Sequence, residues 1–90
     1  MDLVYKIQYL EVVVKAHIPS LSSDVKKIIK RTIEERLTTD PVRFGKPLRF
    51  SLKGHRRLRV GDYRIIYRIQ PKETLVLIVA IKHRKDIYED

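Results

Sequence analysis

The chain has 90 residues, no cysteine, and a net charge of +9 from 20 Lys and Arg against 11 Asp and Glu. This length fits one domain, residues 1–90, and the absence of thiols excludes disulfides and thiolate chemistry. No apolar run approaches the roughly 18–20 residues of a membrane span, and no basic stretch leads into an apolar signal segment, so we expect a cytoplasmic protein that makes no membrane contact.

The N-terminal third predicts a strand and a short helix. Residues 4–9 alternate apolar and polar side chains, which is the pattern of a strand with one buried face. Residues 11–18 predict a helix more weakly, because they include a run of β-branched valines. Pro19 ends that segment.

A clearer helix prediction follows. Ser22 or Ser23 can cap its N-terminus, and Asp24 is favoured in the first turn by the helix dipole. Its Lys, Arg and Glu residues indicate a solvated outer face, and residues 39–41 stop it. The side chains expected on its buried face are Val25, Ile28, Ile29, Ile33 and Leu37.

The second half predicts strands at residues 48–52, 55–60, 63–69 and 74–81. Gly61 and Asp62 should join the middle two in a type II′ hairpin turn. The last run is apolar throughout, so we expect it near the sheet centre and buried on both faces. The fold class is therefore α+β: an N-terminal strand, one or two helices, and then an antiparallel twisted sheet of three to four strands with the helices on one face.

Basic residues are concentrated in the same half. Residues 43–90 carry thirteen bases and five acids, a net charge of +8, and between residues 43 and 72 ten bases face one acid, Asp62. A one-sided excess of this kind is typical of phosphate binding, although a basic surface can also serve solubility alone.

The predicted hairpin register sorts these bases onto one face. A two-residue turn pairs Arg59 with Arg64. Like charges directly across a strand pair are destabilising, so a sequence that keeps them is expected to use them to bind a polyanion. Arginine suits a polyanion because its planar guanidinium binds phosphate through two hydrogen bonds. We expect an open basic face with His55, Arg57, Arg59, Arg64 and Arg68, and an apolar face with Leu58, Val60, Tyr63, Ile65 and Tyr67 that packs on the helices, with Arg56 at its edge.

The three histidines differ in their expected roles. His55 and His83 lie beside base-rich stretches and could act as general acid or base, since imidazole titrates near neutrality. His17 is expected to be structural or exposed. Their spacing lacks the pattern of a metal site, so no metal and no cofactor is expected.

Three stretches together resemble the RelE/ParE toxin superfamily. They are residues 52–54 (Leu-Lys-Gly), 57–67 (Arg-Leu-Arg-Val-Gly-Asp-Tyr-Arg-Ile-Ile-Tyr) and 83–88 (His-Arg-Lys-Asp-Ile-Tyr). The resemblance covers nearly the whole chain and implies a RelE-like fold and the toxin half of a bacterial or archaeal type II toxin–antitoxin pair.

The resemblance also implies an activity. RelE-like members cleave mRNA in the ribosomal A site without a metal: the ribose 2′-OH attacks the adjacent phosphate and leaves a 2′,3′-cyclic phosphate and a free 5′-OH. Matched by motif, Arg64 would stabilise the phosphoryl charge, Arg84 or His83 would fill a second basic position, and Tyr88 would be the terminal aromatic residue that orients a base or stacks on it. The residues expected to hold the RNA backbone are Lys53, Arg57, Arg59, Arg68 and Lys82.

The sequence departs from RelE at the general base. The two lysines that serve RelE fall here on His55 and Arg57, and arginine is a poor proton acceptor, so either His55 or His83 takes that role or the chain is a weaker enzyme. Two alternatives remain: a ParE-like inhibitor of DNA gyrase without nuclease activity, and a nucleic-acid-binding module without chemistry. The expected partners are an acidic antitoxin, mRNA on the ribosome with contacts to rRNA, and operator DNA reached indirectly through the antitoxin.

Overall fold

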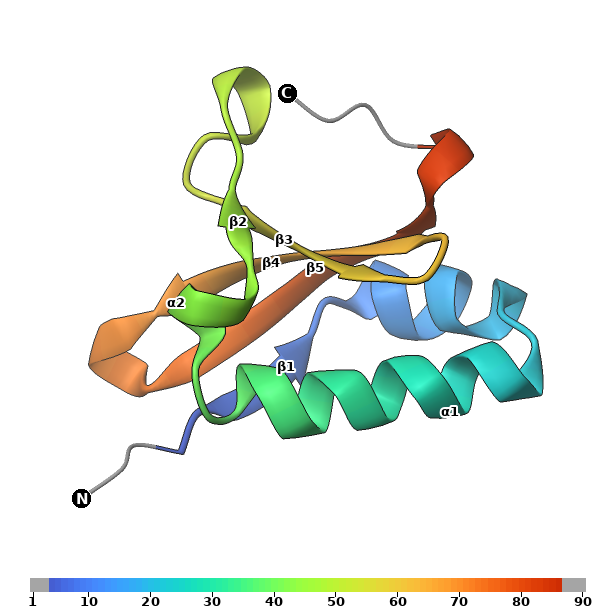
Figure 1. Ribbon diagram of the computed structural model, residues 1–90, viewed down its shortest axis with the longest axis horizontal. Coiled ribbons are helices and arrows are strands. Elements are labelled where there is room, and N and C mark those ends of the chain that lie inside the picture. Colours follow the sequence, from blue (N-terminus) through green and yellow to red (C-terminus); the bar gives the residue numbers. More distant parts are fainter. Residues whose placement is uncertain (1–3, 87–90) are drawn as a thin grey trace.

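The computed structural model describes residues 4–86, which form a five-stranded sheet with helices on one face (Figure 1). The strand order is β1-β5-β4-β3-β2; β1 runs parallel to β5, and all other neighbours are antiparallel. The α+β prediction is confirmed, whereas the parallel pairing of β1 with β5 was not anticipated. The strands are β1 (Lys6–Tyr9), β2 (Lys46–Pro47), β3 (Arg56–Val60), β4 (Tyr63–Gln70) and β5 (Leu75–His83).

Helical segments fill the first half and the connections. The segments η1–η2 and α1–η3 cover one face of the sheet, while η4 and η6 rise from the opposite face (Figure 1). No helix within residues 4–86 is long and apolar enough to cross a membrane. The α-helices are α1 (Ser23–Thr32) and α2 (Pro41–Phe44), the π-helical segments are η1 (Val13–His17) and η3 (Ile33–Leu37), and the 3₁₀ turns are η2 (Ile18–Ser20), η4 (Phe50–Leu52), η5 (Pro71–Glu73) and η6 (Arg84–Asp86).

The hairpin between β3 and β4 forms where the sequence predicted it. Arg59 lies opposite Arg64, as the two-residue turn requires. Gly61 has φ +58° at the first turn position, and Asp62 has no positive φ, which together match a type II′ turn. The predicted register is therefore confirmed.

The capping predictions for α1 also hold. The side chain of Ser22 accepts a hydrogen bond from the backbone N–H of Val25 at 3.3 Å, and Asp24 lies in the first turn. The weaker helix before it is present as well, and Pro19 lies in the 3₁₀ turn that ends it.

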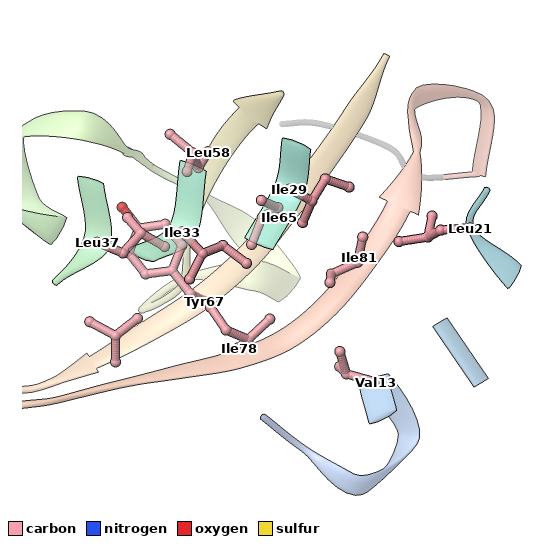
Figure 2. Packing of buried hydrophobic residues seen from close by; sticks show 11 residues of the cluster. Val13, Leu21, Ile29, Ile33, Leu37, Leu58, Ile65, Tyr67, Ile78 and Ile81 are labelled. Carbon is pink, nitrogen blue, oxygen red and sulfur yellow. The ribbon is translucent and has the colours of Figure 1, made fainter. Parts of the chain in front are cut away.

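The core lies between α1–η3 and the helix-facing side of the sheet (Figure 2). Val25, Ile29 and Ile33 follow one another at four-residue spacing, so they share one line along the helix toward the sheet. Ile28 lies beside that line and is 51% exposed, so its predicted place in the core was wrong. The strand side chains that meet this line are Leu58, Ile65, Tyr67, Ile78 and Ile81.

Residues 48–52 do not form the strand that the sequence predicted. β2 ends at Pro47, although the N–H of Leu48 still donates to the carbonyl of His55 at 2.9 Å. Residues 49–54 are needed to reverse the chain between β2 and its antiparallel partner β3. They therefore fold into the turn η4 instead of extending the ladder.

β5 lies next to the centre of the sheet, but it is fully buried on one face only. Val76, Ile78 and Ile81 are buried, whereas Leu75 and Leu77 are half-buried. The prediction of burial on both faces was wrong in this respect. The reason is that the helical layer covers one side of the sheet alone.

Tyr67 anchors α2 and the start of β2. Its hydroxyl donates to the carbonyl of Pro41 at 2.5 Å, and burial raises the pKa of the Tyr67 phenol, which keeps this donor protonated. Arg56 donates to the carbonyls of Val42 at 2.6 Å and Gly45 at 2.8 Å. A Cβ atom at Gly45 would lie 1.8 Å from the Tyr67 hydroxyl, so only glycine fits there. The predicted core position of Tyr67 is thus confirmed.

Candidate nucleic-acid interface

Three basic residues form a row across neighbouring strands on the sheet face that lies away from α1. Arg59 of β3 pairs with Arg64 of β4, and Arg64 pairs in turn with Lys82 of β5. Strands lie about 4.8 Å apart, so the row spans roughly 10 Å. β3, β4 and β5 contain no Asp or Glu. We call the surface formed by Arg57, Arg59, Arg64, Arg68 and Lys82 the basic face.

Arg64 is the buried member of the row. Only 8% of it is exposed, so the expectation that its side chain would face solvent was wrong. It lies on the middle strand, flanked by Arg59 and Lys82, and its guanidinium folds back toward the hairpin turn. One nitrogen donates to the carbonyls of Gly61 and Tyr63, each at 3.2 Å. The position of its charge is therefore fixed before any ligand arrives.

Arg84 reaches the same hairpin turn from the end of β5. Its backbone N–H donates to the carbonyl of Asp62 at 2.7 Å, and its Nε lies 3.6 Å from the Asp62 carboxylate. The Arg84 side chain stays 59% exposed. Because Arg64 binds Gly61 and Arg84 binds Asp62, the fold brings the two predicted catalytic arginines together around one turn.

His83 lies on the opposite face of the sheet. It pairs with Tyr63, one position out of phase with the Arg64–Lys82 pair, so its side chain points to the helical side. The His83 and Tyr63 rings meet edge to face with centroids 5.2 Å apart. The structure therefore does not bring His83 to Arg64.

His55 and Arg57 extend the basic face along β3. His55 directly precedes β3 and, at about 3.4 Å per residue, lies roughly 14 Å from Arg59 along the strand direction. Its Nδ1 is buried and has no hydrogen-bond partner among residues 4–86. Lys53 is exposed in the loop beside it, and Arg68 is exposed further along β4. These residues therefore lie along the strands outside the row of Arg59, Arg64 and Lys82, and His55 is not a member of that row.

His17 has a structural role, as expected. Its Nδ1 accepts a hydrogen bond from the backbone N–H of Ile81 at 3.1 Å, at a point of β5 beyond the end of β1. Burial and the nearby charge of Lys82 lower the pKa of His17, which favours the neutral acceptor form.

Tyr88, the predicted terminal aromatic residue, lies outside the described residues. Residues 4–86 contain no group of three or more His, Asp or Glu side chains placed to hold a metal. Two features of the site were not predicted: the direct pairing of Lys82 with Arg64, and the exposed Phe50 at the start of η4. The pairing of Lys82 with Arg64 depends on the order of the strands. The sequence could have predicted it only if the last strand had been aligned with the second strand of the hairpin.

Sequence comparisons match this chain to known toxins. The family described as "ParE toxin of type II toxin-antitoxin system, parDE" matches residues 14–88. Toxin RelG of Mycobacterium tuberculosis is 48% identical over 52 residues, which are 58% of this chain and 60% of that protein. Toxin RelE of the same organism is 42% identical over 52 residues, 58% of this chain and 54% of that protein. The matched segments thus span less than two thirds of these relatives.

Solved structures agree with the sequence matches. The toxin–antitoxin complex RelBE2 from Mycobacterium tuberculosis contains a chain with a TM-score of 0.85 and 29% identity, covering 93% of this chain and 98% of that one. The isolated E. coli RelE toxin has a TM-score of 0.72 at 17% identity, covering 88% and 83%, and supports the fold alone.

Proposed function

The chain belongs to the RelE/ParE superfamily of type II toxin–antitoxin toxins, and from that premise we propose that it is a metal-independent endoribonuclease that cleaves mRNA on the ribosome and so stops translation. The observation that carries this proposal is the row of Arg59, Arg64 and Lys82, with Arg84 at the adjoining turn. Four bases near one turn suit a phosphodiester whose negative charge grows during cleavage.

The proposed reaction is an internal transfer. The ribose 2′-OH releases its proton to solvent water and attacks the neighbouring phosphate, the bond to the 5′-oxygen breaks, that oxygen takes up a proton, and a 2′,3′-cyclic phosphate remains. Arg64 is the residue that stabilises the phosphoryl oxygens, because its guanidinium is held in place by the turn and stays charged at any relevant pH. Arg59 and Arg57 hold the flanking RNA backbone.

Lys82 is our candidate for the proton donor to the leaving 5′-oxygen. Of the three residues in the row it is the one that can exchange a proton, since arginine does not deprotonate in proteins. It is the direct cross-strand neighbour of Arg64, whereas His83 points to the other face and His55 lies well along β3. Lys82 therefore takes the general-acid role in this proposal, and neither histidine is placed beside Arg64 to serve as the general base.

A purified translation mixture with a defined mRNA tests the activity. We expect cuts at fixed positions within codons, with fragments that end in a 2′,3′-cyclic phosphate. Lys82→Gln should slow cleavage about 10²–10⁴-fold, the usual contribution of a general acid. Lys27→Gln on the outer face of α1 is the matched control and should cleave normally. Intact mRNA during full inhibition of translation would refute the nuclease.

A ParE-like action on DNA gyrase is the second candidate, because the matched family is described as ParE toxin. A gyrase supercoiling assay separates the two: protein-linked DNA breaks with uncut mRNA would favour gyrase. Under either activity we place the protein in the cytoplasm, where both targets are found. We also propose an acidic antitoxin as its partner, as in the solved complex with RelB-type chains, and operator DNA bound through that antitoxin.

A further inference from the structure

Among residues 4–86, Phe50 is the most exposed large apolar residue, at 78% exposure. It opens the 3₁₀ turn η4, and its φ of +54° lies in the left-handed region, which a side chain with a Cβ atom disfavours. The backbone of this turn would accept glycine at that position without strain. The Phe50 side chain is therefore not explained by the turn or by the core.

Thr74 gives a useful contrast, because it is the other non-glycine residue with positive φ among residues 4–86. Thr74 ends the turn η5, and its carbonyl accepts the N–H of Lys6, which starts the pairing of β1 with β5. That conformation serves the fold. No comparable packing role accounts for the ring of Phe50.

The loop around Phe50 is held firmly. The N–H groups of Leu52, Lys53 and His55 donate to the carbonyls of Arg49, Phe50 and Leu52 at 3.0–3.1 Å. An aromatic ring on a hydrogen-bonded turn is presented in a fixed place, so little conformational freedom is lost when a ligand covers it.

The surroundings of Phe50 are basic. Arg49 directly precedes it in the chain and Lys53 follows three residues later, and both are exposed; η4 rises from the side of the sheet opposite α1, across from η6 (Figure 1). A flat apolar ring between cations is the combination that binds unpaired nucleotides: the cations meet phosphates, and the ring stacks on a base.

We propose that Phe50 is a stacking platform for an unpaired base of the RNA that lies on the basic face. This inference rests on the proposed function and adds a base contact to the phosphate contacts proposed for the basic face. Phe50 lies in the turn before β3, whereas Arg64 pairs with Arg59 near the hairpin at the other end of β3, so the stacked base is several nucleotides away from the bond that is cleaved. Phe50 is thus a positioning residue.

The absence of tryptophan in this chain permits a direct optical test. Phe50→Trp places one indole at the proposed platform, and Phe44→Trp places one at a control site, where Phe44 packs near Arg36 and Arg43. Both proteins are titrated with a short 2′-O-methyl oligouridine, which lacks the nucleophile for cleavage, and with an abasic strand of equal length. Binding is followed independently by anisotropy of a label on the strand.

We expect indole quenching in Phe50→Trp with oligouridine, little with the abasic strand, and none in Phe44→Trp. Phe50→Ala should weaken oligouridine binding about 5- to 150-fold, the range for loss of one stacked base, while its thermal stability stays the same because both side chains carry a Cβ atom and the ring is exposed. Phe50→Trp should keep wild-type affinity.

Other outcomes separate the inference from the proposed function. Tight binding of oligouridine without indole quenching would overturn the platform and leave the RNA-binding proposal intact. No binding of either strand, even at low salt, would overturn the platform, whereas the nuclease itself is refuted only by intact mRNA in the translation assay. An indole response to the antitoxin but not to RNA would assign Phe50 to the partner protein and overturn the inference.

Discussion

Arg64 combines a structural contact with the charge that the proposed reaction needs. Arg64→Ala should lower the cleavage rate about 10²–10³-fold, as expected for removal of one group that stabilises developing charge. It should also lower the free energy of unfolding by about 1–2 kcal/mol, because the carbonyls of Gly61 and Tyr63 lose a donor. Single-turnover cleavage and thermal unfolding measure the two effects.

Arg59→Ala is the matched comparison within the same row. Arg59 is exposed, so its removal should leave stability within about 0.5 kcal/mol. A folded Arg64→Ala protein that cleaves RNA at the wild-type rate would refute the role assigned to Arg64.

His17 predicts a dependence of stability on pH. Its pKa is lowered in the folded state, so below the reference value near 6.5 the unfolded chain takes up a proton that the folded chain resists. Stability from this group is therefore present above pH 6.5 and is lost as the pH falls. Lys82, His83 and Asp86 line the same pocket as His17, so their charges contribute to the electrostatic field at the His17 imidazole.

The measurement is the melting temperature at pH 7.5 and pH 5.5. We expect the wild type to lose a few degrees more than His17→Gln, whose amide does not titrate. Equal losses in the two proteins would show that the hydrogen bond to Ile81 does not sense pH.

At the scale of elements, α1 offers two adjacent isoleucines in opposite environments. Ile29 is 3% exposed and packs in the core, whereas Ile28 is 51% exposed. Ile29→Ala should lower the free energy of unfolding by about 2–5 kcal/mol, and Ile28→Ala by no more than about 0.5 kcal/mol. Denaturant unfolding of both variants tests which face of α1 packs on the sheet. Similar decreases in the free energy of unfolding for the two variants would contradict the assigned face.

The sequence predicted well those helices and strands whose formation depends on residues close together in the chain. The hairpin follows from Gly61-Asp62 and the alternation around it, and α1 follows from its cap and its four-residue spacing. The parallel pairing of β1 with β5 joins segments far apart in the chain, so no local pattern reports it. The strand expected at residues 48–52 failed because apolar content there reflects a buried Leu48 and an exposed Phe50 on a turn.

The candidate site divides in the same way. Alternation correctly placed Arg57, Arg59 and Arg64 on one face, because that depends on the hairpin alone. The burial of Arg64, the position of Lys82 beside it and the opposite orientation of His83 all depend on how β5 aligns with β4. Register between non-adjacent segments is decided by tertiary packing, which periodicity does not contain.

At the scale of the whole molecule, the fold separates two kinds of charged surface. The helical side mixes Lys and Arg with Glu, as in the pair Lys15–Glu11 at 2.5 Å, whereas the strands of the opposite side carry bases without acids. A polyanion should therefore bind one side, although bases are present on both. Total charge alone does not predict this, but the location of each base does.

Salt dependence of RNA binding tests that separation. Each phosphate contact of a single strand releases counterions, so removal of one contact should reduce the slope of log K against log salt by about 0.7. We expect that reduction for Arg59→Gln on the basic face and no change for Lys27→Gln on α1, although both substitutions remove one positive charge. Anisotropy titrations of a labelled oligonucleotide at several salt concentrations give both slopes. Equal slopes for the two variants would mean that the net charge of +9, and not the basic face, attracts the RNA.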